Sequence, residues 1–231
     1  MARSKPKRSQ FERLPVKVIH RIISFLPEPL SLQSLSYTSW KFFYIIHMSK
    51  RGLLRTIMLN CLGGEEVLAM ATWLHRCQPP QLISSADNVG PEDSEDPFLT
   101  EKLLYIDDFL ETRPSTVSHS TWPIQDAIEI CDFHCQAVRP LVKDFVNSCC
   151  EGSETLSRNL GKRSISTAEM RRAALALYGF ELFRRLFGAT RASMSIMKTY
   201  YQRFFTAFAP WELARMSCIH DFVARLITAG M

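Results

Sequence analysis

The 231-residue sequence is poor in glycine, with 9 Gly against 15 Phe, and no apolar run approaches the roughly 20 residues that span a bilayer. So little glycine leaves few residues for the tight turns of an all-β architecture. The periodic stretches place apolar residues at steps of three and four, and no run of four or more residues alternates apolar and polar between turn signals. We therefore expect an all-α fold and no membrane-spanning segment.

The amino terminus lacks the apolar core of a signal peptide, and the seven cysteines are an odd number scattered along the chain. A disulfide framework is not expected, so the thiols should be reduced. These features fit a protein of the cytoplasm, the nucleus or both.

Charge is unevenly distributed although the net charge is only +5. Residues 1–60 hold 11 Lys or Arg and 2 acidic residues, net +9, whereas residues 61–231 hold 17 and 21, net −4. The first 60 residues are therefore strongly basic, whereas the rest of the chain is weakly acidic. We expect residues 1–13 to form a disordered basic tail. Alternatively, its run RSKPKR (3–8) is a nuclear-localisation signal or a phosphate-binding patch of a nucleic-acid or chromatin-associated protein.

Proline residues divide the first part of the chain into a small unit over residues 14–50. Pro15 suits the first turn of a helix, which Pro27 and Pro29 then end. Ser31 can cap a second helix, and a third, short helix carries Phe42.

Residues 51–231 are expected to form an irregular helical bundle that an acidic loop at 84–97 interrupts. Ser166 and Glu169 form a capping box, and the helix that follows is apolar over so much of its circumference that we place it at the bundle centre. Pro140 should either kink its helix or split it into two helices near Val138 and Arg139. A break at Gly63 and Gly64 precedes the first expected helix of this region. The expected helices cover 65–77, 98–111, 122–150, 166–187, 191–208 and 211–227.

Residues 14–46, LPVKVIHRIISFLPEPLSLQSLSYTSWKFFYII, resemble an F-box. They open with Leu-Pro, place Ile and Leu at helical steps, contain a short Pro-containing turn and close with Thr-Ser-x-Lys-Phe. Lys17 and Trp40 depart from the family pattern, which has an acid at the first position and a basic residue at the second. Residues 156–187 and 204–222 resemble the helical region that often follows the F-box in fungal F-box proteins, with Pro-Trp-Glu and Cys-Ile-His-Asp elements.

The resemblance implies a non-enzymatic substrate receptor of an SCF-type (cullin-RING) ubiquitin ligase, without a cofactor. The F-box of such a subunit docks on the Skp-family adaptor, and through it on the cullin, while the remaining chain recruits a protein target. The residues to which the resemblance assigns adaptor binding are Leu14, Pro15, Ile19, Ile22, Leu26, Leu32, Leu35 and Phe42. Because family members often continue beyond the Pro-Trp-Glu element, we also expect an exposed apolar face on the last helix, around Met216, Ile219, Val223 and Ile227.

Two groups of side chains suggest other chemistry. Cys131, His134 and Cys135 share a helical face and offer atoms that zinc prefers, but their spacing fits no usual zinc site. Cys218 and His220 suggest a nucleophile and a base, but residues two apart on a helix point away from each other. We therefore expect neither a metal site nor a catalytic site, and a thiol enzyme ranks behind the nucleic-acid alternative.

Overall fold

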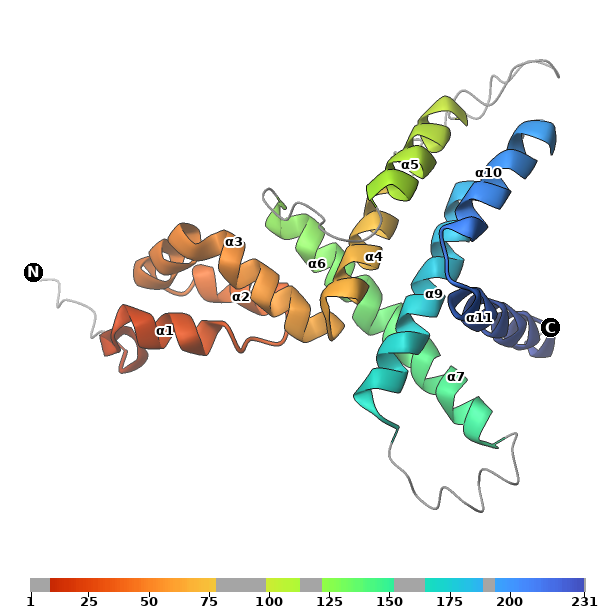
Figure 1. The fold of residues 1–231 in the computed structure, drawn as a ribbon. Coiled ribbons are helices and arrows are strands. Elements are labelled where there is room, and N and C mark those ends of the chain that lie inside the picture. Colours follow the sequence, from red (N-terminus) through yellow and green to blue (C-terminus); the bar gives the residue numbers. More distant parts are fainter. Residues whose placement is uncertain (1–8, 78–98, 113–121, 152–164, 189–193, 231) are drawn as a thin grey trace, which may run out of the picture. The chain divides into compact units, whose positions relative to one another are not determined.

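A computed structural model gives the fold (Figure 1). It describes residues 9–77, 99–112, 122–151, 165–188 and 194–230. Within these ranges all regular structure is helical and no strand occurs, which confirms the expected all-α fold. No helix in this part of the chain has both the length and the apolar character needed to cross a membrane. The basic run 3–8 and the acidic loop 84–97 lie outside the described residues.

The described residues form two compact units, each built from segments that are far apart in the sequence. The first unit consists of residues 9–64 and 122–133. The second unit begins at Glu65 and also includes the described residues from His134 onward. A boundary near residue 50, as the sequence suggested, would fall inside a helix that continues to Leu62.

The first unit contains a 3₁₀ turn and four helices. They are η1 (Phe11–Arg13), α1 (Val16–Ile23), α2 (Pro29–Ser36), α3 (Trp40–Leu62) and α6 (Ile124–Phe133). Helix α2 begins two residues before the expected cap Ser31, because Pro29 occupies the first turn, where a missing N–H leaves no carbonyl unpaired. The hydroxyl of Ser31 instead donates to a carboxylate oxygen of Glu28 at 3.3 Å.

Helix α3 is 23 residues long, not the short helix that the sequence suggested. The side chain of Ser39 caps its start by accepting a hydrogen bond from the backbone N–H of Phe42. At its end Gly63 has φ 81°, a conformation that favours glycine, and its N–H donates to the Leu59 carbonyl at 2.9 Å. The Gly63–Gly64 pair thus ends the helix, as expected.

Apolar side chains from α1, α2 and α3 form the core of the first unit. Ile19 and Ile23 of α1 and Leu32 of α2 are 0% exposed. Helix α6 packs against α2 and α3, and its buried side chains include Ile128 and Ile130. A segment that follows α3 by some 60 residues of sequence therefore completes this unit.

The second unit is organised around α9, which packs against α4, α7 and α11, while α10 packs against α5. The sequence prediction of a central helix is confirmed. The elements are α4 (Glu65–Arg76), α5 (Leu99–Thr112), the π-helical turn η4 (His134–Val138), α7 (Arg139–Glu151), α9 (Thr167–Phe187), α10 (Met194–Thr206) and α11 (Pro210–Ala229).

The start of α9 is set by a local sequence signal, and its middle and end make specific contacts with other helices. At the start, Ser166 and Glu169 form the predicted capping box, with the N–H of Ser166 donating to the Glu169 carboxylate at 2.8 Å. In the middle, a Cβ added at Gly179 would lie 3.1 Å from the sulfur of Met216, so glycine permits a close approach of α11. At the end, the Arg185 guanidinium donates to the Leu74 carbonyl of α4 at 3.3 Å.

The expected irregularity near Arg139 takes the form of the π-helical turn η4, directly before Pro140 in the chain. A proline inside a helix lacks one N–H donor, and its ring collides with the carbonyl four residues earlier. A wider turn at this point accommodates the ring without ending the helix.

The carboxyl-terminal helix differs from expectation. Met216 and Ile219, predicted on an exposed face, are 7% and 1% exposed because this part of α11 packs on α9. The prediction is wrong for these two residues. Of the other two, Val223 is half-buried and Ile227 is 59% exposed, so the apolar face is exposed only towards the end of the helix.

Candidate docking surface

The F-box-like segment buries one apolar stripe of α1 and exposes another. Ile19 and Ile23 are buried, whereas Val18 and Ile22, also one turn apart, are both 42% exposed. Phe25 follows the helix directly and is 68% exposed, with the Arg21 guanidinium 5.3 Å from its ring centroid. Helix α1 therefore has two apolar stripes, and the first unit buries only one of them.

The start of α3 also presents aromatic side chains to solvent. Trp40 is 76% exposed and stacks on Phe43, with ring centroids 5.2 Å apart and planes 23° apart. Phe43 in turn stacks on His47 at 5.8 Å. These positions are three and four residues apart, so the rings form a ladder along one face of the helix.

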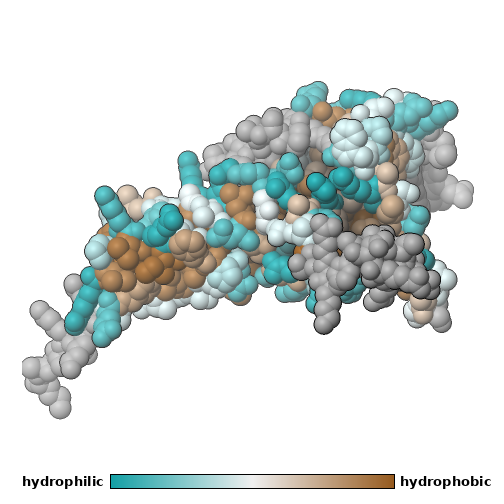
Figure 2. All heavy atoms as spheres, turned by 60° about the horizontal axis from the view of Figure 1, so that its bottom comes forward, coloured by the Kyte–Doolittle hydropathy of each residue, from teal (hydrophilic) through white to brown (hydrophobic). Residues whose placement is uncertain are grey.

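Exposed large apolar side chains concentrate in this segment. Among the described residues, ten of them lie between Val16 and Met48 and five elsewhere. Figure 2 shows hydrophobic surface gathered over this unit, at the left of the view. We call these ten side chains the exposed apolar set: Val16, Val18, Ile22, Phe25, Leu30, Tyr37, Trp40, Phe43, Tyr44 and Met48. Such a concentration is typical of a surface that another molecule covers.

Lys41 fixes the start of the segment to α3. Its ammonium group donates to the backbone carbonyls of Glu12 at 2.6 Å and Leu14 at 2.9 Å. The rings of Phe11 and Phe42 lie 5.0 Å apart at the same place. The folded unit therefore starts before residue 14. The sequence analysis included Lys41 in the Thr-Ser-x-Lys-Phe element but did not predict its contacts with the two backbone carbonyls.

The structure distributes the predicted adaptor-binding residues over three environments. Pro15 and Ile22 are exposed, and Leu14, Leu26 and Leu35 are partly exposed. The remaining three, Ile19, Leu32 and Phe42, are at most 4% exposed. Buried side chains support the shape of the surface, and a partner would contact them only if the unit opened. Val18, Phe25 and Trp40 are exposed beside the predicted set but were not included in it.

His134, considered above as a metal ligand, is engaged elsewhere. Its Nδ1 atom lies 3.2 Å from the hydroxyl oxygen of Tyr178. Burial lowers the pKa of His134 to about 4, and the charge of Arg139 lowers it further in the same direction. No group of three or more His, Cys, Asp or Glu side chains able to hold a metal occurs in the described ranges.

The pair considered for catalysis lies on the surface of α11. His220 Nδ1 is 3.1 Å from the Asp221 carboxylate, and both side chains are more than 60% exposed. Cys218 is exposed and forms no hydrogen bond with the described residues. For Cys77, burial raises the thiol pKa to about 12 against the lowering effect of Arg185, so this sulfur stays protonated at neutral pH.

Comparisons of the chain with protein-family models, with curated proteins and with solved structures found no match. The features of this chain that bear on its function are therefore the motif in residues 14–46 and the exposure of its side chains.

Proposed function

We propose that this protein is a non-catalytic substrate receptor of an SCF-type ubiquitin ligase, acting in the cytoplasm or nucleus. Its first unit docks on the Skp-family adaptor, and through it on the cullin, and its second unit recruits a protein target for degradation. The observation that carries the proposal is the coincidence of the exposed apolar set with the F-box-like motif. The resemblance of the motif suggests which partner binds. The exposed apolar side chains give the physical reason for binding, because a partner would remove them from water.

The exposed apolar set is of a kind suited to a standard protein interface. Such an interface covers about 800 Å² on each partner, and a few central aromatic or aliphatic side chains supply most of the affinity. Phe25 and Trp40 are large, exposed by more than two thirds, and held by contacts to Arg21 and Phe43. Preordered aromatic side chains lose little conformational freedom on binding. Central anchors of this kind each contribute about 2 kcal/mol or more.

The test is co-purification of the full chain with a Skp-family adaptor. In the variant Val18→Glu with Ile22→Glu, two carboxylates enter the exposed stripe of α1. We expect adaptor binding to weaken by about 100-fold or more, because a complex would bury both charges unpaired. Leu226→Glu with Ile227→Glu is the matched control, since both are exposed apolar residues of α11, at 46% and 59%, in the second unit.

Two further results separate the alternatives. Replacing both Leu14 and Pro15 by Ala should also abolish adaptor binding with little change in the far-UV helical signal. Adaptor binding that survives both double substitutions would overturn the docking assignment. A wild-type chain that instead retains nucleic acid, released by salt, would favour the nucleic-acid-associated function that the basic run 3–8 suggests.

A further inference from the structure

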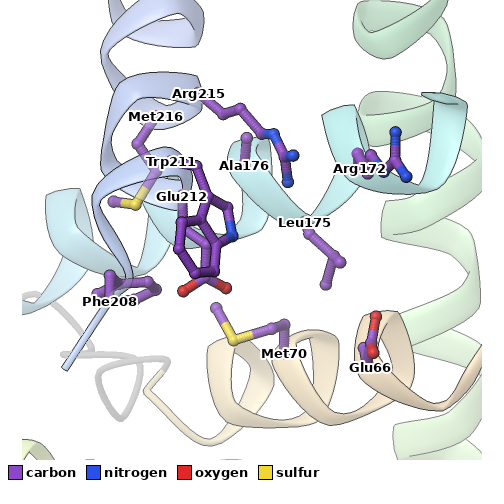
Figure 3. A pocket seen from close by; sticks show the side chains of 10 residues that line it. All are labelled: Glu66, Met70, Arg172, Leu175, Ala176, Phe208, Trp211, Glu212, Arg215 and Met216. Atoms are coloured by element: carbon purple, nitrogen blue, oxygen red, sulfur yellow. The ribbon is translucent and has the colours of Figure 1, made fainter.

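A pocket of about 430 Å³ lies between α4, α9 and α11 in the second unit (Figure 3). Its apolar lining includes Met70, Leu175 and Met216, one from each helix. Trp211 stands beside this lining, and the guanidinium groups of Arg172 and Arg215 complete it on the α9 side. The volume falls in the range of sites that hold small ligands or a few peptide residues.

The carboxylates of this pocket are engaged, whereas its guanidinium groups are not. Glu66 forms an ion pair with Arg171 at 3.2 Å, and Glu212 accepts a hydrogen bond from the backbone N–H of Ala209 at 2.8 Å. Arg172 and Arg215 have no ion pair or hydrogen bond with any described residue. In Figure 3 Arg215 reaches from α11 towards α9, which carries Arg172. Two guanidinium groups, that of the exposed Arg172 and that of the half-buried Arg215, therefore have no direct ion-pair partner next to an apolar lining.

Trp211 offers an aromatic face at the same place. It is 64% exposed although it lies in the first turn of a helix that packs on α9. Pro210 and the Glu212 hydrogen bond to Ala209 fix the backbone on both sides of it. An exposed Trp on a rigid helix start is the type of side chain that dominates binding sites for peptides.

We propose that this pocket binds a short peptide segment of a partner protein in which one carboxylate adjoins a large apolar side chain. The carboxylate meets Arg172 and Arg215, and the apolar side chain packs on Trp211 and Met70. Guanidinium groups bind carboxylates in charge-assisted pairs, which are strengthened next to apolar surface. The carboxylate is either an Asp or Glu side chain or a chain terminus, since both present the same chemistry.

A single carboxylate fits this pocket better than a polyanion. Glu66 and Glu212 stand at its border, and residues 61–231 carry a net charge of −4. A nucleic acid would bring several phosphates against these negative charges. Identifying the bound protein as a ligase target rests on the proposed function, whereas the peptide binding itself does not.

Fluorescence anisotropy on the full chain tests the proposal with two pairs of fluorescein-labelled peptides. The first pair is Gly-Ala-Leu-Glu-Phe-Ala-amide and its Gln counterpart. The second pair is Gly-Ala-Gly-Ala-Leu-Phe with a free carboxyl terminus and the same peptide amidated. We expect the charged member of one pair to bind about 10-fold or more tightly than its neutral counterpart, and that pair identifies the source of the carboxylate. No preference in either pair would overturn the proposal.

Variants locate the binding. Arg172→Gln with Arg215→Gln should weaken the preferred peptide by about 10-fold or more, whereas Lys143→Gln with Arg225→Gln should change it by less than about two-fold. The control also removes two positive charges, but from exposed positions of α7 and α11 that do not line the pocket. Trp211→Ala should also weaken binding, and Trp211→Phe should restore part of it.

Equal loss in the two charge variants would overturn the proposal, because the affinity would then follow net charge alone. Tighter binding of labelled oligo(dT) with the same dependence on Arg172 and Arg215 would overturn it in favour of a nucleic-acid site. The Val18→Glu with Ile22→Glu variant should bind the peptide as wild type does. Failure of peptide binding and failure of adaptor docking are therefore distinguishable.

Discussion

His134 and Tyr178 form a buried polar pair that connects the π-helical turn η4 to the central helix α9. The imidazole Nδ1 lies 3.2 Å from the phenol oxygen, and the two rings are parallel within 8°. The residues are 6% and 1% exposed, so the contact between the two polar groups is largely removed from water. The histidine thereby holds a fixed position in the second unit while remaining neutral at physiological pH.

This pair predicts acid sensitivity. The pKa of His134 falls from 6.5 to about 4 on folding, chiefly through burial. A depressed folded-state pKa contributes stability above pH 6.5 that is lost as the pH falls towards 4. The loss should be roughly 3 kcal/mol in the free energy of unfolding, at about 1.4 kcal/mol per pKa unit. Denaturant unfolding at a series of pH values measures it.

His134→Gln is the control, because glutamine can still bond the Tyr178 hydroxyl but does not titrate in this range. The variant should be less stable at pH 7 and should lose less stability than wild type between pH 6.5 and 4. Parallel pH profiles for the two proteins would contradict the assignment.

Lys41→Met should destabilise the first unit by about 1–3 kcal/mol, because two backbone carbonyls lose a charge-assisted donor while the apolar stem is kept. Faster hydrogen exchange at the N–H groups of Arg13 and Leu14, which donate within η1, would report the loosening directly. Lys50→Met serves for comparison. Lys50 lies on the same helix, and its ammonium group makes no hydrogen bond to the described residues. Equal effects of the two substitutions would show that the carbonyl contacts do not matter.

Phe204→Ala should cost the second unit about 3–5 kcal/mol. The ring is 0% exposed and lies 5.8 Å from Phe109 of α5 and 5.5 Å from Phe187 of α9, so its loss leaves a cavity between three helices. Thermal unfolding gives the difference.

Phe180→Ala provides the contrast on the central helix. The apolar pattern of α9 suggests a buried ring there, but Phe180 is only partly buried and packs against the exposed His220 at 5.9 Å. Its removal should cost about 1–2 kcal/mol, since a partly exposed ring loses less contact area. A larger loss for Phe180 than for Phe204 would show that the helix packs differently.

Gly179 predicts a steep dependence on side-chain size. Alanine gains up to about 1 kcal/mol of helix propensity, which offsets a contact of 3.1 Å to the flexible Met216 side chain, so Gly179→Ala should be near neutral. Valine adds two branches at the same point, and Gly179→Val should cost about 2 kcal/mol or more. Adding Met216→Ala should recover part of that cost. Equal stability of the Ala and Val variants would contradict a close contact between α9 and α11.

Helix limits were predictable where the sequence contains local signals, and partnerships between helices were not. The capping box at Ser166, the Gly63–Gly64 break and Pro210 act within a few residues, so they can be recognised without a structure. The apolar residues of α6 show only that the helix is buried on one face, not that α2 and α3 cover it. In α1 both stripes are apolar, and only the structure distinguishes the buried stripe from the exposed one.

The candidate sites show the same limit. The motif predicts a docking surface within residues 14–46, but the residues assigned to it include side chains of the core, such as Ile19 and Leu32, because apolar periodicity does not encode exposure. The sequence marked Trp211 only as part of a helix start and of the Pro-Trp-Glu element, and neither indicates a pocket. That Arg172 and Arg215 have no ion-pair partner can be recognised only from the structure, which shows that Glu66 and Glu212 contact other groups.

The division of the first unit between residues 9–64 and 122–133 has a consequence for biosynthesis. A ribosome that has just translated the whole F-box-like motif has not yet made α6, so the surfaces of α2 and α3 that α6 covers are still open. More than 60 further residues must be added first, and they include α4 and α5 of the second unit. Completion of the first unit thus waits for non-local contacts, which form late. During this interval apolar surface is open to chaperones on the nascent chain.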